Sequence, residues 1–281
     1  EWEWSKSDIV LTDIENNPDV HMARNLHFFS TMGIAGIGEV TIQNFYKNGL
    51  KTINDIVNCS VKDFQKIKGI GKIKSENFYN NIKKVLTTIP IDRYFVAITG
   101  FNSSLGRKLI KILFRHLPNV IEMSSVEIAD HFKKFPIKGF GKVRIADIVK
   151  NMPLMKTRLY GIHKEYVKES IKYNKIKNEQ IKISGGNPKI RGQKFVLTGF
   201  MGNNDYDFED YIYDNGGDFL EEVTKDVTAV IAASVSTTSG KIIKATELEI
   251  QVFTLQEFII RYNVDIEKFR HIIENNNISN N

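Results

Sequence analysis

The sequence predicts a multidomain α plus α/β protein, in which an all-α array of repeated two-helix units precedes a small domain built on a parallel sheet. Three observations carry this prediction. A Gly-apolar-Gly pattern recurs at a nearly fixed interval through the first half of the chain. Near residue 191 the hydrophobic pattern changes from helical to short alternating strands and helices, and the net charge changes sign at about the same place.

Composition is that of a globular protein, with 42% hydrophobic and 26% charged residues among 281. The single cysteine, Cys59, excludes an internal disulfide framework and a cysteine-rich zinc site, which favours a reducing intracellular compartment. No apolar run approaches a bilayer-spanning length and no secretory signal is visible, so we expect no membrane partner. Because the first residue is Glu and not Met, we expect an excised fragment or a processed product.

Five segments follow from the pattern along the chain. They are an N-terminal strand and lead-in helix (1–30), four two-helix units (31–152), a basic helical linker (153–190), the sheet domain (191–264) and a disordered polar tail (265–281). The alternating "EWEWSKSDIVL" predicts the first strand. The turn-rich "GGNPKIRG" marks the boundary before the sheet domain.

The repeated pattern begins at Gly36, Gly69, Ser104 and Gly139, at intervals of 33, 35 and 35 residues. Each unit reads as two short helices around a tight hairpin, with the second helix opening directly after the second glycine. The residue between the two small positions is apolar, so we expect it to enter the core of its unit; these residues are Ile37, Ile70, Leu105 and Phe140. Two leading helices open with a capping-box pattern, Ser60 with Asp63 and Ser124 with Glu127.

A helix opening presents unpaired N–H groups and a partial positive charge, and both suit a phosphate. Lys72, Arg107 and Lys142 directly follow the second glycine, where the helix dipole alone favours an acid. The first unit has Glu39 there, and the third has Ser104 for its first glycine, so we expect these two units to bind less tightly. Any one unit could be an ordinary turn between packed helices, but four in register favour an anion-binding array.

The distribution of net charge also divides the chain into a basic repeat region and an acidic sheet domain. Residues 1–22 carry a net charge of −5, residues 23–192 carry +19, residues 193–262 carry −7 and the tail carries −1. A strongly basic segment with repeated helix openings is typical of a protein that binds a nucleic-acid backbone.

The hairpins resemble the helix-hairpin-helix motif, and the last domain resembles a BRCT domain through "FVLTG", "NGG" and "SGKIIKA", with Phe258 where many such domains have Trp. The whole arrangement resembles the C-terminal half of NAD-dependent DNA ligases, with "HFFSTMGIAGIGEVTIQNFYKNGL" and "LFRHL" as specific segments. The leading "EWEWSKSDIVL" is most similar to versions from large DNA viruses. The family's Lys-x-Asp-Gly nucleophile and its four-cysteine zinc module do not occur in this sequence, so the chain by itself is not expected to form lysyl-AMP.

The resemblance implies that the chain clamps nicked duplex DNA, without sequence preference, through minor-groove phosphate contacts for nick sealing in replication and repair. The expected DNA-binding residues are Gly36, Gly38, Gly69, Ile70, Gly71, Lys72, Lys74, Gly106, Arg107, Lys108, Gly139, Gly141, Lys142 and Arg144. NAD and Mg²⁺ are implied for the complete ligase and not for this chain. Adenylation and oligonucleotide-binding domains, in cis or in trans, are the implied partners, together with a protein partner for the BRCT domain.

Thr198, Gly199 and Lys241 match a phosphate site of some BRCT relatives, whereas the local alternative is a strand end and a surface lysine. The −7 charge of this domain favours the alternative. Two other functions remain open. One is a stand-alone, non-enzymatic DNA-binding scaffold in repair; the other is a family-X polymerase, for which "DYD" at 205–207 is the sole local resemblance.

Overall fold

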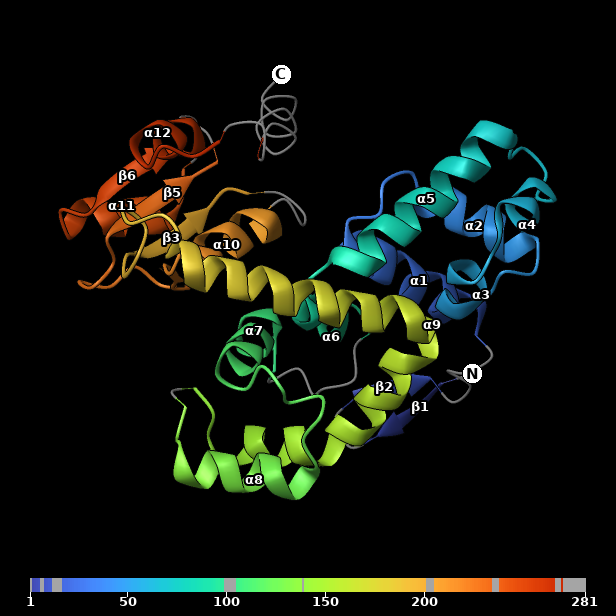
Figure 1. The fold of residues 1–281 in the computed structure, drawn as a ribbon, viewed down its shortest axis with the longest axis horizontal. Coiled ribbons are helices and arrows are strands. Elements are labelled where there is room, and N and C mark those ends of the chain that lie inside the picture. The colour runs from blue at the N-terminus through green and yellow to red at the C-terminus, as the bar shows by residue number, and fades with distance from the viewer. Residues whose placement is uncertain are drawn as a thin grey trace. The chain divides into compact units, whose positions relative to one another are not determined.

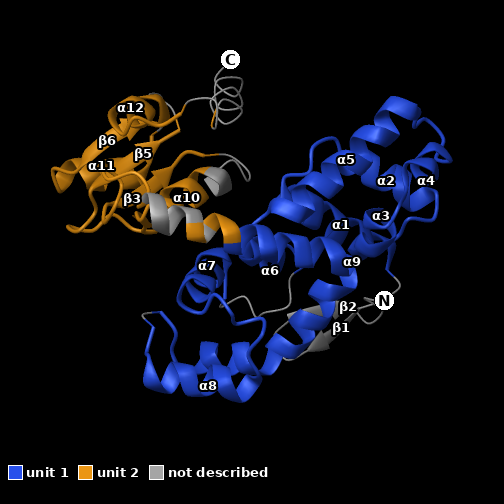
Figure 2. Ribbon diagram, viewed as in Figure 1, with its two compact units in different colours: residues 1–175 blue, residues 176–281 orange. Residues whose placement is uncertain are grey.

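The computed structural model describes residues 2–5, 8–11, 17–98, 105–137, 139–200, 205–233, 238–265 and 269. The chain divides into two compact units, residues 1–175 and residues 176–281 (Figure 2). The described residues of the first unit form helices and one short β-hairpin, and those of the second form a parallel sheet with helices on both faces (Figure 1). This confirms the predicted fold class.

The N-terminal segment forms two strands where the sequence predicted one. β1 (Trp2–Ser5) pairs antiparallel with β2 (Asp8–Leu11), and Trp2 lies opposite Leu11. The single-strand prediction was therefore wrong. The alternating pattern continues past Ser5 in the sequence, so it does not distinguish one long strand from two short ones. Each of the two strands has four residues, which is within the usual range of strand lengths.

The helices of the first unit follow the predicted repeat. They are α1 (Pro18–Met32), α2 (Glu39–Lys47), α3 (Ile53–Val57), α4 (Val61–Gln65), α5 (Lys72–Thr88), α6 (Ile91–Ala97), α7 (Arg107–His116), α8 (Ser125–Lys134) and α9 (Lys142–Ser184), of which the last helix continues past residue 175 into the second unit. Both predicted capping boxes are present, at the start of α4 and at the start of α8. A third box, from Thr52 and Asp55, opens α3.

Helix α9 runs without interruption through Pro153, where the sequence placed a segment boundary. A proline inside a helix leaves the carbonyl four residues earlier without its N–H partner. Here that carbonyl belongs to Val149, and the hydroxyl of Ser125 donates a hydrogen bond to it at 3.0 Å. Helix α8 therefore supplies the missing donor, and the fourth hairpin continues directly into the basic helix.

The break in α9 comes at His163, whose φ of −163° and ψ of 98° are not helical. The ring Nδ1 of His163 accepts from the backbone N–H of Tyr166 at 3.3 Å, as an N-cap does. On the other side of the break, the amide of Asn58 at the end of α3 donates to the carbonyl of Ile162 at 3.1 Å. The two segments of α9 are thus capped separately, which accounts for the kink.

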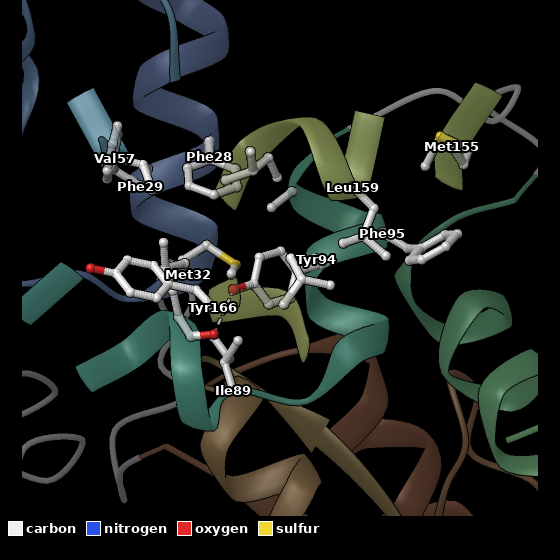
Figure 3. Close-up of a cluster of buried hydrophobic side chains, with 14 of the residues drawn as sticks. Phe28, Phe29, Met32, Val57, Ile89, Tyr94, Phe95, Met155, Leu159 and Tyr166 are labelled. Atoms are coloured by element: carbon white, nitrogen blue, oxygen red, sulfur yellow. Dashed lines mark hydrogen bonds between the residues drawn. The ribbon is translucent and has the colours of Figure 1, made fainter. Parts of the chain in front are cut away.

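One hydrophobic core joins the helices of the first unit, and Figure 3 shows part of it. Phe28 of α1, Tyr94 of α6 and Leu159 of α9 belong to it and are fully buried. The hydroxyl of Tyr94 donates to the carbonyl of Leu86 at 2.6 Å, so its one polar atom is satisfied. Segments far apart in the sequence therefore form a single packed body.

The second unit has the predicted order of elements. They are β3 (Lys194–Thr198), α10 (Asp205–Asp214), β4 (Asp218–Phe219), β5 (Ala229–Ala232), α11 (Gly240–Glu247), β6 (Gln251–Thr254) and α12 (Leu255–Arg261). The strands are parallel in the order β4-β3-β5-β6. The predicted disordered tail, apart from residues 265 and 269, lies outside the described residues.

The two faces of this sheet bury different helices, because alternate side chains of a strand point to opposite sides. Phe195 of β3 packs with Phe208 of α10 and Phe258 of α12. Its neighbour Val196 packs on the opposite side with Ala245 of α11. Phe258, which stands where many BRCT domains have Trp, is completely buried in this core.

Candidate nucleic-acid interface

The hairpins have the backbone that their sequence predicts. Gly36, Gly69 and Gly139 have φ values of +84°, +85° and +93°, a region that disfavours side chains with a Cβ. The predicted central residues, Ile37, Ile70, Leu105 and Phe140, are all buried, with at most 7% exposure. The buried side chain anchors each turn to its core and leaves the flanking backbone at the surface. Ser104 lies outside the described residues.

The second glycine of each hairpin comes directly before a helix. Gly38, Gly71 and Gly106 are the N-caps of α2, α5 and α7, and none of these helices has a side-chain cap. Gly141 takes the same place before α9. A Cβ built on any of the four meets nothing within 4 Å, so the space in front of the first helical turn is open.

Six other helices in the described ranges are capped at their N-terminus by a side chain of the N-cap residue. Asn17, Thr52, Ser60, Ser124, Ser239 and Thr254 accept hydrogen bonds from the first turns of α1, α3, α4, α8, α11 and α12. Helix α6, which begins after Pro90, has no such cap. The hairpin helices therefore present N–H groups that side chains occupy elsewhere in the chain.

The predicted cations lie beside these open turns. Lys72 and Lys142 are exposed and make no ion pair with a residue in the described ranges. Lys74 lies over the ring of Phe78 at 5.5 Å. Arg107 and Lys108 are half-exposed in the first turn of α7. These side chains add positive charge where the helix dipole is already positive.

Arg144 has a structural contact that its sequence position did not indicate. Its Nη1 donates to the carbonyl of Gly139 at 2.6 Å. Thr41, at the matching position of the first unit, donates to the carbonyl of Gly36 at 3.2 Å. In both hairpins the second helix thus fastens the turn that precedes it, so Arg144 holds the turn as well as adding charge.

The first two hairpins hold each other in place. The amide of Asn44 in α2 donates to the carbonyl of Lys68 at 3.3 Å, and the amide of Asn81 in α5 donates to that of Ala35 at 3.4 Å. Lys68 and Ala35 are the residues just before Gly69 and Gly36. The exchange is reciprocal, so it fixes the two turns side by side. Sequence reasoning missed both asparagines, because only the fold brings them to the turns.

The third and fourth hairpins are also in contact. A Cβ on Gly139 would lie 3.2 Å from Cδ2 of Leu109 in α7. In the first pair, a Cβ on Gly36 would lie 3.4 Å from Cε1 of Phe78 in α5. In both pairs, the first glycine of one hairpin therefore lies close to the second helix of the other hairpin.

A hollow of about 430 Å³ lies near α3 and α4 in the first unit, and Asp55, Cys59 and Asp63 are among the residues that line it. Both carboxylates are engaged in capping boxes. Burial raises the pKa of the Cys59 thiol to about 11, so it is protonated at neutral pH. Neither the thiol nor the two carboxylates are therefore available as reactive groups in this hollow.

In the second unit, the three residues of the candidate phosphate site converge, but two of them are engaged with protein groups. The hydroxyl of Thr198 donates to Oγ of Ser239 at 2.8 Å. Nζ of Lys241 donates to the carbonyl of Leu197 at 3.0 Å. Gly199, with a φ of +77°, turns the chain after β3. Ser239 was not predicted, although a serine before a helix is a typical cap.

The described ranges contain neither a metal cluster nor a membrane span. No group of three or more His, Cys, Asp or Glu side chains there could hold a metal ion. None of the helices in those ranges combines the length and the apolar character needed to cross a membrane.

Two family models match the chain. A SAM-like helix-hairpin-helix tandem matches residues 31–84, and a BRCA1 C-terminus (BRCT) domain matches residues 186–259. The first match covers the reciprocal pair of hairpins, and the second covers most of the parallel sheet domain. Both resemblances that the sequence motifs indicated are confirmed.

The chain is also similar to DNA ligases. A DNA ligase of Acanthamoeba polyphaga mimivirus is 25% identical over 92% of this chain and 39% of its own length. DNA ligases of Lachnoclostridium phytofermentans and Caldicellulosiruptor saccharolyticus are 28% and 27% identical over 83% of this chain, and over 35% and 33% of their own lengths. The chain thus consists of a helix-hairpin-helix region and a BRCT domain, and it is similar to viral and bacterial DNA ligases over about 33% to 39% of their length.

Proposed function

We propose that this chain is the DNA-binding portion of an NAD-dependent DNA ligase and that its hairpin array clamps nicked duplex DNA. The observation that carries the proposal is the set of open helix starts on a segment with a net charge of +19. Phosphates would accept from the N–H groups after Gly71 and Gly141, next to Lys72 and Lys142. The similarity to DNA ligases supports duplex DNA as the ligand.

Contacts through backbone amides and lysines read no base edges, so binding is independent of sequence. The minor groove suits such contacts, because its pattern of donors and acceptors distinguishes bases poorly. The reciprocal asparagine contacts hold the first two turns together, so both can contact one duplex without rearranging. Positioning of a nicked duplex is thus the contribution of this chain to nick sealing.

Adenylation is assigned to other domains, acting in cis or in trans, because Lys-x-Asp-Gly does not occur in these 281 residues. NAD and Mg²⁺ would serve those domains. Incubation of the chain with labelled NAD should therefore leave no covalent AMP on it, as judged by denaturing electrophoresis. An adenylated band stable to denaturation would contradict this assignment.

Two assays test the proposal. Fluorescence anisotropy with nicked duplexes of unrelated sequence should give similar affinities, and selection of one base sequence would refute it. Adding the chain to a ligase adenylation domain should increase nick sealing. Tight DNA binding without any gain in sealing would favour the alternative, a non-enzymatic DNA-binding scaffold in repair.

A further inference from the structure

Three aliphatic side chains are exposed at one equivalent position of the hairpins. Val40, Ile73 and Val143 are the second residues of α2, α5 and α9, and 80%, 75% and 77% of their surface is accessible to water. Single exposed aliphatic residues are ordinary on protein surfaces. These three, however, occur at the same position of three repeats, and each side chain lies next to a first helical turn with open space in front of it. This recurrence is not expected of isolated surface residues.

The surroundings of these side chains limit what could cover them. Each lies two residues after a glycine with open space in front of it, and Lys72 and Lys142 precede two of them. A partner that touches the amides, the lysines and the aliphatic groups together must place apolar surface within one residue of an anion. The sugar-phosphate backbone has this alternation, since a phosphate is always followed by a sugar.

The sugar also decides which nucleic acid fits. Deoxyribose offers only C–H groups at its 2′ position, whereas the minor groove of an RNA helix displays 2′-hydroxyls. A valine or isoleucine cannot hydrogen-bond a hydroxyl that it covers, so contact with ribose costs desolvation of that group. Aliphatic groups at these positions therefore favour DNA over RNA.

We propose that Val40, Ile73 and Val143 pack on deoxyribose in the minor groove and set a preference of the array for DNA over RNA. This inference rests on the proposed DNA-binding function and adds to it a determinant of sugar specificity. The third hairpin has Lys108 at the matching position and contributes charge in place of apolar contact.

Threonine is the appropriate replacement, because it keeps β-branching and nearly the shape of valine but adds a hydroxyl. The test variant is V40T/I73T/V143T in the full chain. Val126 provides a matched control: it is the second residue of α8 and is 69% exposed, but Ser124 caps that helix. All replaced groups are exposed, so thermal melting followed by circular dichroism should be unchanged.

The affinities for a nicked DNA duplex and for an RNA duplex of the same sequence are measured by fluorescence anisotropy. The triple variant should bind DNA about tenfold more weakly, and RNA no more weakly than the wild type, because the 2′ position that the three side chains cover is apolar in DNA and carries a hydroxyl in RNA. The DNA-to-RNA ratio of V126T should equal that of the wild type.

Equal ratios for the triple variant and V126T would overturn this inference while leaving DNA binding intact. A wild-type chain that binds neither duplex would instead refute the proposed function. The two failures are therefore distinguishable in one experiment.

Discussion

The sequence Gly-Lys-Ile opens two helices of this chain, and the two openings differ. In α5, Gly71 is the N-cap, Lys72 is exposed and no side chain caps the first turn. In α11, Ser239 is the N-cap, and Lys241 donates to the carbonyl of Leu197. Three identical residues thus give an open helix start in the first unit and a closed one in the second.

A three-residue motif such as Gly-Lys-Ile therefore does not by itself define an anion-binding site. The residue before the glycine decides whether the first turn is capped, and the fold decides where the lysine finds an acceptor. Charge adds to the contrast, since the open start belongs to a segment of +19 and the closed one to a segment of −7. The contrast supports the proposal that DNA binds to the hairpins and not to the BRCT domain.

Reversing the charge of the hairpin lysines should reduce DNA affinity more than any other change proposed here. The double variant K72E/K142E should bind nicked DNA roughly 100-fold more weakly at about 0.1 M salt, because two phosphate contacts become repulsive. Glu39→Lys should leave affinity unchanged or raise it, since it adds a cation at the first hairpin. Anisotropy titrations compare these variants, and equal losses from reversal at every hairpin would contradict the predicted ranking.

Blocking the open turns should have the next largest effect. Gly71→Val and Gly141→Val should each weaken DNA binding about tenfold, because the side chain enters the space through which a phosphate would approach the amides. The loss of stability should be limited to the N-cap preference for glycine over valine, since a Cβ there meets nothing within 4 Å and neither φ is positive. Gly38→Val is the comparison at the first hairpin, and a loss of affinity equal to that of Gly71→Val would contradict the ranking.

The two glycines of one hairpin should differ in stability. Gly69→Ala should lower the free energy of unfolding by about 1 kcal/mol, because the φ of Gly69 is +85°. Gly71→Ala should lower it by less, because the φ of Gly71 is −82° and only the N-cap preference for glycine over alanine is lost. Urea denaturation of both variants measures the difference, and identical midpoints would show that the positive φ carries no cost.

Lys241→Gln should have the smallest effect on DNA binding. Its ammonium group is held by the Leu197 carbonyl and lies in an acidic domain, so affinity for nicked DNA should stay within about twofold of wild type. Anisotropy titration against Lys72→Gln makes the comparison. A larger loss of affinity for Lys241→Gln than for Lys72→Gln would move the DNA site to the BRCT domain.

Local patterns in the sequence predicted much of the fold. The glycine repeat predicted the turns, their buried central residues and the helix starts, because each depends on a few adjacent residues. The capping boxes at Ser60 and Ser124 were predictable for the same reason. The element order of the BRCT domain followed from strand and helix periods.

Long-range partners were not predictable. Pro153 indicated a break, and only the packing of α8 on α9 brings the Ser125 hydroxyl to the freed carbonyl. The kink at His163 depends in the same way on Asn58, which comes from a distant part of the chain. At the candidate site, the position of Arg144 indicated a phosphate ligand, whereas its guanidinium also binds the Gly139 carbonyl. Side chains that satisfy distant backbone groups leave no local pattern.

The salt dependence of DNA binding tests the central claim most directly. For the full chain, the logarithm of the association constant should fall linearly with the logarithm of salt concentration as counterions are released. Replacing Lys72 and Lys142 with Gln should reduce the slope by about two, roughly one for each phosphate that is no longer neutralised. Lys241→Gln should leave the slope unchanged. A slope that is the same in the wild type and in the variant with both Lys72 and Lys142 replaced would contradict a phosphate clamp built on the hairpins.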